Sequence, residues 1–100
     1  MTYLLCRNRV KDFSRWKAVL VSHEAAHLNA GLRLVWLGIE APNNVFFVFE
    51  VASMEKARKF ISDPEAGKAA EASGVIDAEY HFVEDAGGYS GKGATTKGPF

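Results

Sequence analysis

Residues 45–51, with the sequence VFFVFEV, constrain the fold more than any other stretch of this chain. Side chains alternate between the two faces of a β-strand, so the odd-numbered residues point to one face while Phe46 and Val48 point to the other. Both faces of this strand are therefore apolar. A sheet that contains it needs a cover on each face, because exposed apolar surface costs about 25 cal/mol per Å².

The rest of the chain supplies helices for only one face of the sheet. Apolar and β-tolerant residues predict strands at 3–10, 32–39, 45–51 and 75–83, and apolar steps of three and four predict helices after Asp12 and after Ser53. The order β-α-β-β-α-β is typical of the α+β ferredoxin-like fold, in which a four-stranded antiparallel sheet carries two helices on one face.

Capping residues mark the ends of the two predicted helices. Asp12 caps the first helix and Gly31 ends it. The second helix restarts at Asp63 and Pro64, an N-cap followed by proline at the first helical position, and runs on to Gly74. A turn at 41–44 joins the second and third strands into a hairpin.

The second predicted strand has the same two apolar faces as the third. Strict alternation puts Leu32, Leu34 and Trp36 on one side, and it puts Val35, Leu37 and Ile39 on the other. Two helices cover only one face of such a sheet. We therefore expect a homodimer in which a second copy covers the other face, sheet against sheet.

Charge excludes several classes of partner. Twelve basic and twelve acidic residues cancel, which argues against a nucleic-acid or membrane-surface role. In the predicted fold the fourth strand lies beside the first, so Arg7 and Arg9 are expected to face Asp77 and Glu79. The single cysteine, Cys6, is interpreted as a small buried side chain on the first strand.

One hundred residues are enough for one domain, expected at 1–84, followed by a glycine-rich C-terminal tail at 85–100. No apolar run approaches the roughly 20 residues of a membrane span. The first residues lack the pattern of a signal peptide, so the expected location is cytoplasmic.

The stretch SHEAAH, residues 22–27, has the spacing of a zinc-peptidase motif. His23 and His27 would lie one turn apart on a helix and bind zinc, with Glu24 as general base. A third ligand is missing, because Arg33 occupies the position of the histidine in the extended form of the motif. We therefore reject peptidase activity and predict no metal site.

The same histidines are candidates for acid/base chemistry. On a helical wheel they fall on the apolar face of the first helix together with Trp16 and Leu20, so both imidazoles should point toward the sheet. Histidine is the usual proton shuttle near neutral pH. His23 and His27 are the predicted catalytic residues, and the residues predicted to line a ligand pocket with them are Trp16, Trp36, Phe47, Phe49, Glu50, Tyr80 and His81.

Several stretches between residues 3 and 83 resemble the dimeric α+β barrel superfamily, which includes antibiotic-biosynthesis monooxygenases and polyketide-cyclase-like enzymes. They are VKDFSRWK at 10–17, AGLR at 30–33, APNNVFFVFEV at 41–51, KARKFISDPE at 56–65 and SGV at 73–75. The resemblance implies a homodimeric barrel with a pocket between the helices and the sheet of each subunit.

The resemblance transfers no catalytic residue. Cyclases of this superfamily carry a His-Pro-x-His stretch where this chain has Asp63-Pro64-Glu65-Ala66, and the haem-degrading members need a Trp and a His that residues 53–75 lack. The expected function is cofactor-free monooxygenation, cyclisation or isomerisation of a small aromatic or polyketide-like molecule, with His23 or His27 as acid/base. The alternative is a non-catalytic homodimer, either ligand-binding or structural.

Overall fold

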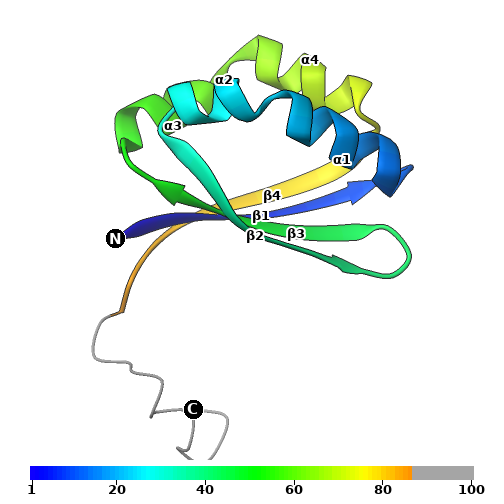
Figure 1. Cartoon of the computed structure of the whole chain (residues 1–100), viewed down its shortest axis with the longest axis horizontal. Coiled ribbons are helices and arrows are strands. Elements are labelled where there is room, and N and C mark those ends of the chain that lie inside the picture. The colour runs from blue at the N-terminus through cyan, green and yellow to red at the C-terminus, as the bar shows by residue number, and fades with distance from the viewer. Residues whose placement is uncertain (87–100) are drawn as a thin grey trace, which may run out of the picture.

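The computed structural model of the chain describes residues 1–86 (Figure 1). Most of the tail expected at 85–100 therefore lies outside the described residues. The described part contains four strands and four helical segments: β1 Thr2–Val10, α1 Phe13–Ser22, α2 Glu24–Asn29, β2 Leu32–Glu40, β3 Asn44–Val51, α3 Met54–Ser62, α4 Pro64–Ala72 and β4 Val75–Glu84.

The strands form one antiparallel sheet in the order β2-β3-β1-β4. All four helical segments lie on one face of this sheet, and the other face has no helix over it (Figure 1). The predicted ferredoxin-like α+β fold is confirmed. The number of helical segments is four because each of the two predicted helices is interrupted once.

The first interruption, at His23, was not predicted. His23 has φ −102° and ψ 12°, so α1 ends at Ser22 and α2 begins at Glu24. Its ring Nδ1 lies 2.8 Å from the carbonyl oxygen of Val19, which also accepts a 2.7 Å bond from the Ser22 hydroxyl. Side chains that bond to a backbone carbonyl in this way compete with the helical hydrogen-bond pattern. The prediction of one continuous helix up to residue 30 was therefore wrong.

The second interruption, at Asp63, was predicted. Asp63 has an extended backbone, φ −71° and ψ 127°, and its side chain accepts a 2.9 Å bond from the backbone N–H of Glu65. Pro64 occupies the first position of α4, where its missing N–H costs nothing. A residue that precedes proline is disfavoured in the helical region, so α3 ends here.

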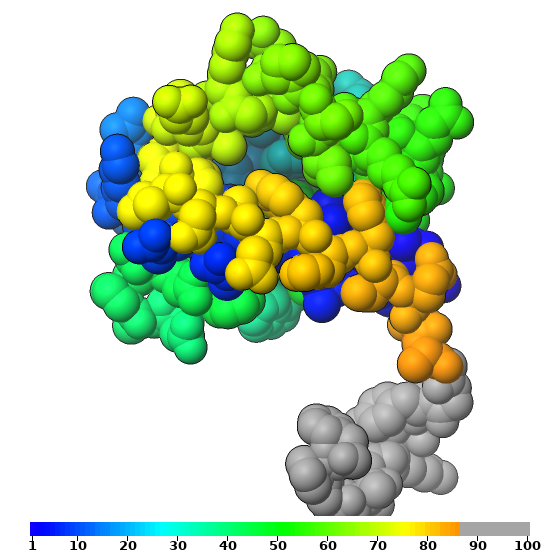
Figure 2. Space-filling model, turned by 180° about the vertical axis from the view of Figure 1, so that it is seen from behind, coloured from blue at the N-terminus to red at the C-terminus, as the bar shows by residue number. Residues whose placement is uncertain are grey.

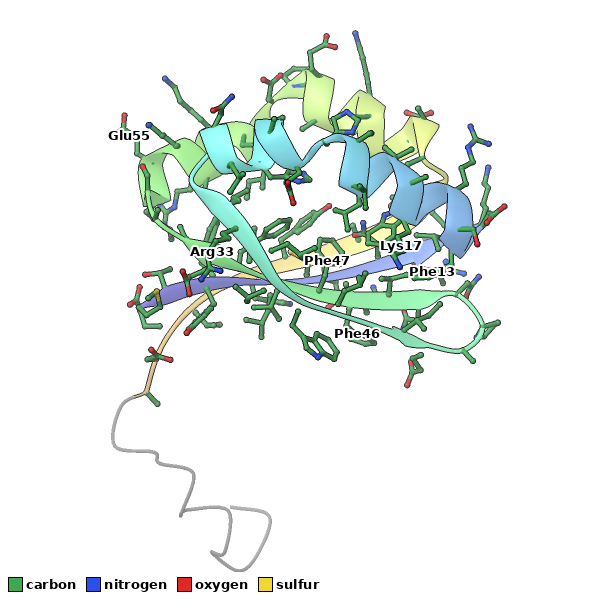
Figure 3. The ribbon with its side chains drawn as sticks, viewed as in Figure 1. Phe13, Lys17, Arg33, Phe46, Phe47 and Glu55 are labelled. Atoms are coloured by element: carbon green, nitrogen blue, oxygen red, sulfur yellow. The ribbon has the colours of Figure 1, made fainter. Side chains whose placement is uncertain are left out.

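The core lies between the sheet and the helices, and it is built from alternate strand residues. β3 contributes Val45, Phe47, Phe49 and Val51, and Figure 3 shows Phe47 on the helix side and Phe46 on the opposite side. This parity was predicted correctly, as was the burial of Cys6. The remaining buried apolar residues are Leu4, Val10, Trp16, Ala30, Leu32 and Ala57.

Strand β2 departs from strict alternation. Leu34 pairs with Phe49, but the next paired residue is Trp36, opposite Val48, because a bulge at Val35 shifts the register. Leu37 and Ile39 therefore share the helix-facing side with Leu34, and Trp36 points to the open side. The predicted grouping of Trp36 with Leu34 was wrong, since one extra residue reverses every side chain that follows it.

The predicted charge pairing across β1 and β4 is confirmed. Arg7 lies opposite Glu79 and Arg9 lies opposite Asp77 in the sheet. The guanidinium of Arg7 donates to Glu79 at 2.8 Å and to Asp77 at 3.0 Å, and Arg9 donates to Asp77 at 2.9 Å. These bonds hold the pKa values of both carboxyl groups below their usual range.

No helix in residues 1–86 is long and apolar enough to cross a membrane.

Gly31, between α2 and β2, is in the left-handed region with φ +73°, and a Cβ there would lie 3.0 Å from the backbone nitrogen of Ser53. Gly31→Ala is expected to lower the free energy of unfolding by about 1–2 kcal/mol, because an L-residue is strained in this region. Gly67→Ala is the matched control, since its Cβ meets nothing within 4 Å and alanine favours the helix. Urea unfolding that found both variants equally stable would contradict this account.

Candidate functional site

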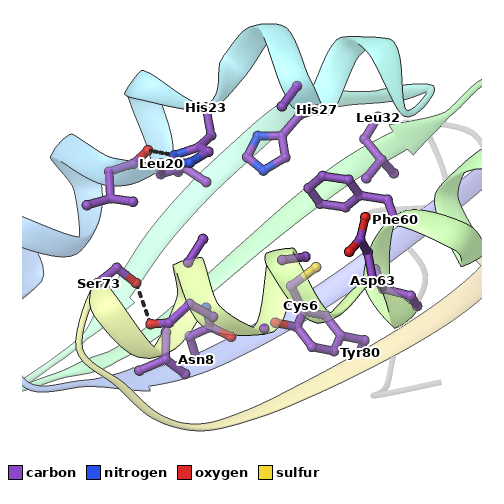
Figure 4. A pocket seen from close by; sticks show the side chains of 18 of the residues that line it. Cys6, Asn8, Leu20, His23, His27, Leu32, Phe60, Asp63, Ser73 and Tyr80 are labelled. Atoms are coloured by element: carbon purple, nitrogen blue, oxygen red, sulfur yellow. Dashed lines mark hydrogen bonds between the residues drawn. The ribbon is translucent and has the colours of Figure 1, made fainter.

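A cavity of about 630 Å³ lies between the helical layer and the sheet. Seen from behind in Figure 2, the surface is hollowed between α3–α4 and β4, and teal atoms of the α1–α2 segment are visible inside the hollow. Every layer of the fold contributes to the lining: Leu4, Cys6 and Asn8 of β1, Phe47 and Phe49 of β3, Tyr80 of β4, Trp16 and Leu20 of α1, and His27 of α2 (Figure 4).

The helix above the cavity lines it mainly with small side chains. α4 contributes four small residues, Ala66, Gly67, Ala69 and Ala70, together with Glu65 and Lys68, and none of its residues is fully buried. Side chains of this size do not reach the sheet, so the space that a leucine or phenylalanine would fill is left between α4 and the strands. The small side chains of α4 thus contribute to the opening.

His27 projects from α2 into this cavity (Figure 4). Its half-buried ring lies 5.1 Å from the ring of Phe49 and 5.4 Å from that of Phe60, between centroids. Within residues 1–86 the ring makes no hydrogen bond to a protein group. Burial lowers the pKa of His27, and the neighbouring His23 lowers it further. The imidazole is therefore neutral at neutral pH and has a nitrogen available to accept a proton.

His23 also lines the cavity, but it has a structural bond that His27 lacks. Its Nδ1 lies 2.8 Å from the carbonyl oxygen of Val19, an acceptor, so Nδ1 carries the proton and Nε2 the lone pair. This bond fixes the tautomer and orientation of His23. Of the two predicted catalytic residues, His27 has the less constrained imidazole.

The floor of the cavity carries three polar groups. Burial raises the pKa of the Cys6 thiol and of the Tyr80 hydroxyl, so both are neutral at neutral pH, and the thiol donates to the Leu4 carbonyl at 3.8 Å. Asn8 is buried, and its amide satisfies two neighbours when Oδ1 accepts from the Trp16 indole at 3.2 Å and Nδ2 donates to the Arg7 carbonyl at 3.0 Å. The cavity is thus mostly apolar with a few neutral polar groups.

The structure brings together only part of the predicted pocket. Trp16, Phe47, Phe49 and Tyr80 line the cavity with the two histidines, while Trp36, Glu50 and His81 lie on the opposite face of the sheet. Paired residues on neighbouring strands point to the same face of the sheet. Glu50 pairs with Tyr3 and Arg33, and His81 pairs with Leu5, so both point to the open face. The bulge at Val35 turns Trp36 to that face as well.

Sequence reasoning missed Phe60, Cys6 and the alanines of α4 as lining residues. Two signals were present in the sequence. The alternation of Leu4, Cys6 and Asn8 places them on one face of β1, and the four small residues among 66–70 mark a helix with few side chains large enough to fill space.

Glu24, the third chemically active residue of the SHEAAH stretch, does not line the main cavity. It lines a smaller groove on the other side of His27. Among residues 1–86 no three His, Cys, Asp or Glu side chains are arranged to hold a metal ion.

No protein-family model matches the chain, and no curated protein matches its sequence. Solved structures match its fold. SnoaB, a cofactor-independent oxygenase from Streptomyces nogalater, has a TM-score of 0.60 at 15% identity and is matched over 83% of this chain and 90% of its own. A protein from Deinococcus radiodurans assigned to the antibiotic biosynthesis monooxygenases has a TM-score of 0.62 at 13% identity over 84% and 91%.

An uncharacterised NIPSNAP-domain protein from Burkholderia xenovorans matches as well, with a TM-score of 0.62 at 12% identity over 90% of this chain and 99% of its own. The chain therefore has the ferredoxin-like α+β fold of the antibiotic biosynthesis monooxygenase-like proteins. This confirms the fold expected from the resemblance. Function still has to be argued from the site, because one fold hosts several activities.

The lowered pKa of His27 has a consequence for stability. Its unfolded-state pKa is about 6.5, so below that pH the unfolded chain binds a proton that the native ring resists, and stability falls as pH drops from 7.5 toward 5. His27→Phe, which keeps a ring between Phe49 and Phe60, is expected to reduce this fall. Thermal unfolding at pH 7.5 and 5.5 measures it, and identical pH dependence in both proteins would contradict the assignment.

Proposed function

We propose that the protein binds a flat, largely apolar phenol or polyketide-like molecule in the main cavity and transforms it without a bound cofactor, with His27 as general base. The observation that carries the proposal is the His27 imidazole, which is neutral, lacks a protein hydrogen-bond partner among residues 1–86 and borders an aromatic cavity. A pocket of this size with few polar groups suits a molecule of two or three fused rings.

The first chemical step would be proton abstraction. His27 takes the proton of a phenol O–H or of a C–H next to a carbonyl, and the electron pair stays on the substrate as a phenolate or enolate. The neutral Tyr80 hydroxyl is a donor on the cavity floor that favours the anion. The anion then attacks its own carbonyl in a cyclase, is reprotonated elsewhere in an isomerase, or reacts with dissolved dioxygen in an oxygenase.

We further propose that the protein is a homodimer joined through the open face of the sheet. The apolar side chains on that face include Leu5, Trp36, Phe46 and Val83, which are 39%, 55%, 37% and 36% exposed in the single chain. They form one band across all four strands. Such a band on a small protein marks an interaction surface, and a second identical face matches it in chemistry.

A panel of hydroxylated naphthalenes, anthrones and linear poly-β-ketones tests the proposed activity. Each compound is titrated into the protein in air while Trp16, whose indole lines the cavity, reports binding by fluorescence, and mass spectrometry follows conversion. We expect one class to bind and to be converted. Trp16→Phe controls for the signal of Trp36. Binding without conversion would support a ligand-binding protein instead, and a panel without any binder would contradict both.

A further inference from the structure

A second, smaller groove reaches His27 from the opposite side. It has a volume of about 90 Å³ and opens beside β2, whereas the main cavity opens toward β4, so the two lie toward opposite edges of the sheet. Four residues border both spaces: Leu20, His27, Leu32 and Phe49. Of these four only His27 can carry a proton, so its imidazole separates a large compartment from a small one.

The volume of the groove limits the size of the molecules that it can hold. At about 90 Å³ the groove has room for a few water molecules and is much smaller than the main cavity of about 630 Å³. Most of its lining is apolar, with Val21, Leu28 and Leu34 among the walls. The two charged residues that line it are Glu24 and Arg33.

Glu24 is the proton acceptor that such a passage needs. It is exposed on the first turn of α2, three residues before His27, so the two side chains occupy neighbouring positions on one face of that helix. Arg33 is already paired with Glu50 at 2.8 Å, which leaves the Glu24 carboxylate as the available proton-accepting group of the groove.

We propose that this groove is the route by which His27 exchanges protons with solvent, and that Glu24 is the relay residue at its mouth. The inference rests on the proposed role of His27 as base. After His27 has taken a proton from a substrate that fills the main cavity, the imidazolium gives it to water in the groove. The water passes a proton to the Glu24 carboxylate, and the carboxylic acid releases it to bulk solvent, so the neutral imidazole returns.

Other titratable groups surround His27 and offer competing routes. His23 follows α1, and Cys6 and Tyr80 rise from the sheet. The charged groups of the main cavity come from the α3–α4 side: Asp63, Glu65 and Lys68. A substrate in the main cavity would separate His27 from those three, whereas the groove stays open to water.

The test needs no substrate. Histidine labelled with ¹³C on the ring gives, by relaxation dispersion at the midpoint of the His27 titration, the rate of proton exchange at that ring. The rate is measured at several imidazole concentrations. The term that grows with imidazole reports transfer to buffer in the main cavity. The rate extrapolated to zero buffer reports transfer to water through both spaces, and the variants below resolve the share that passes through the groove.

Glu24→Gln is expected to lower the zero-buffer rate at least tenfold and to leave the buffer term unchanged. Glu65→Gln is the matched control, because Glu65 is also an acidic residue in the first turn of a helix but lines the main cavity. Leu28→Trp, which fills the groove while keeping both Glu24 and His27, is expected to slow the zero-buffer rate as well.

An unchanged zero-buffer rate in Glu24→Gln, or a drop in Glu65→Gln instead, would overturn the relay. If Glu24→Gln does not fold, Leu28→Trp decides alone: a wild-type zero-buffer rate in that variant has the same meaning. These outcomes are independent of turnover, so the relay can fail while His27 proves to be the base, and the base assignment can fail while the groove still carries protons.

Discussion

His27→Gln is expected to lower kcat for the conversion of a bound phenol or polyketide-like substrate by about 10²–10⁴-fold, the usual contribution of a positioned general base. Glutamine keeps a polar group of similar reach beside Phe49 and Phe60, but its amide does not accept a proton near neutral pH. Binding should change little, since the apolar walls that hold the ligand remain. Stopped-flow or mass-spectrometric turnover, with Kd from Trp16 fluorescence, separates the two effects.

Two matched variants make the result specific. His81 is a histidine on the open face of the sheet, 3.5 Å from Glu79 and outside the cavity, so His81→Gln should leave kcat unchanged. His23→Gln removes the other imidazole and is expected to have a smaller effect, because it is the ring of His27 that packs beside Phe49 and Phe60 in the aromatic part of the cavity. If His23→Gln abolishes turnover while His27→Gln retains it, the base is His23.

Trp36→Glu is expected to convert the dimer to a monomer at micromolar concentration. Trp36 is the most exposed of the large apolar side chains on the open face, and its indole lies over Gly38, where a Cβ would stand 2.4 Å from the ring. A large aromatic residue held in this way is typical of an interface hot spot, worth at least about 2 kcal/mol or 30-fold in Kd. Twofold symmetry would place the introduced charge in the interface twice.

The monomer should still fold, because Trp36 is exposed in the single chain and contributes little to its core. Light scattering measures the mass and circular dichroism the fold. Val21→Glu is the matched control: Val21 is 65% exposed on α1, on the helical side of the molecule, and its substitution should leave the dimer intact. A wild-type protein that is monomeric at these concentrations, or a Trp36→Glu variant that remains dimeric, would contradict the proposed interface.

The fold followed from sequence because its signals are local and repeated. The alternation of β3, the caps at Asp12 and Asp63 and the opposite charges on β1 and β4 each specify a feature that the structure contains. These signals of strand pattern, helix capping and charge pairing all indicate the same fold, and such agreement allows a fold to be predicted from sequence. The ferredoxin-like topology is the arrangement that satisfies all of them.

The site was predicted only in part, for reasons that lie in single residues. The extra residue at Val35 reverses the faces of β2, so Trp36 left the expected pocket although the strand itself was placed correctly. The dihedral angles of His23, whose ring bonds to the Val19 carbonyl, interrupt a helix whose apolar period is continuous in the sequence. Neither effect changes composition or periodicity, so neither is visible before the backbone is known.

The alanine-lined helix α4 has a consequence for how this protein can diverge. The residues that fix the fold are buried in the sheet and in α1 and α3, whereas those that limit the size of a guest, such as Ala66 and Ala70, lie on a helix with no fully buried residue. Selection can therefore enlarge or shrink the guest by changing one or two alanines without disturbing the frame. Proteins that evolve from such a chain would bind ligands of different size while their backbones stay superimposable.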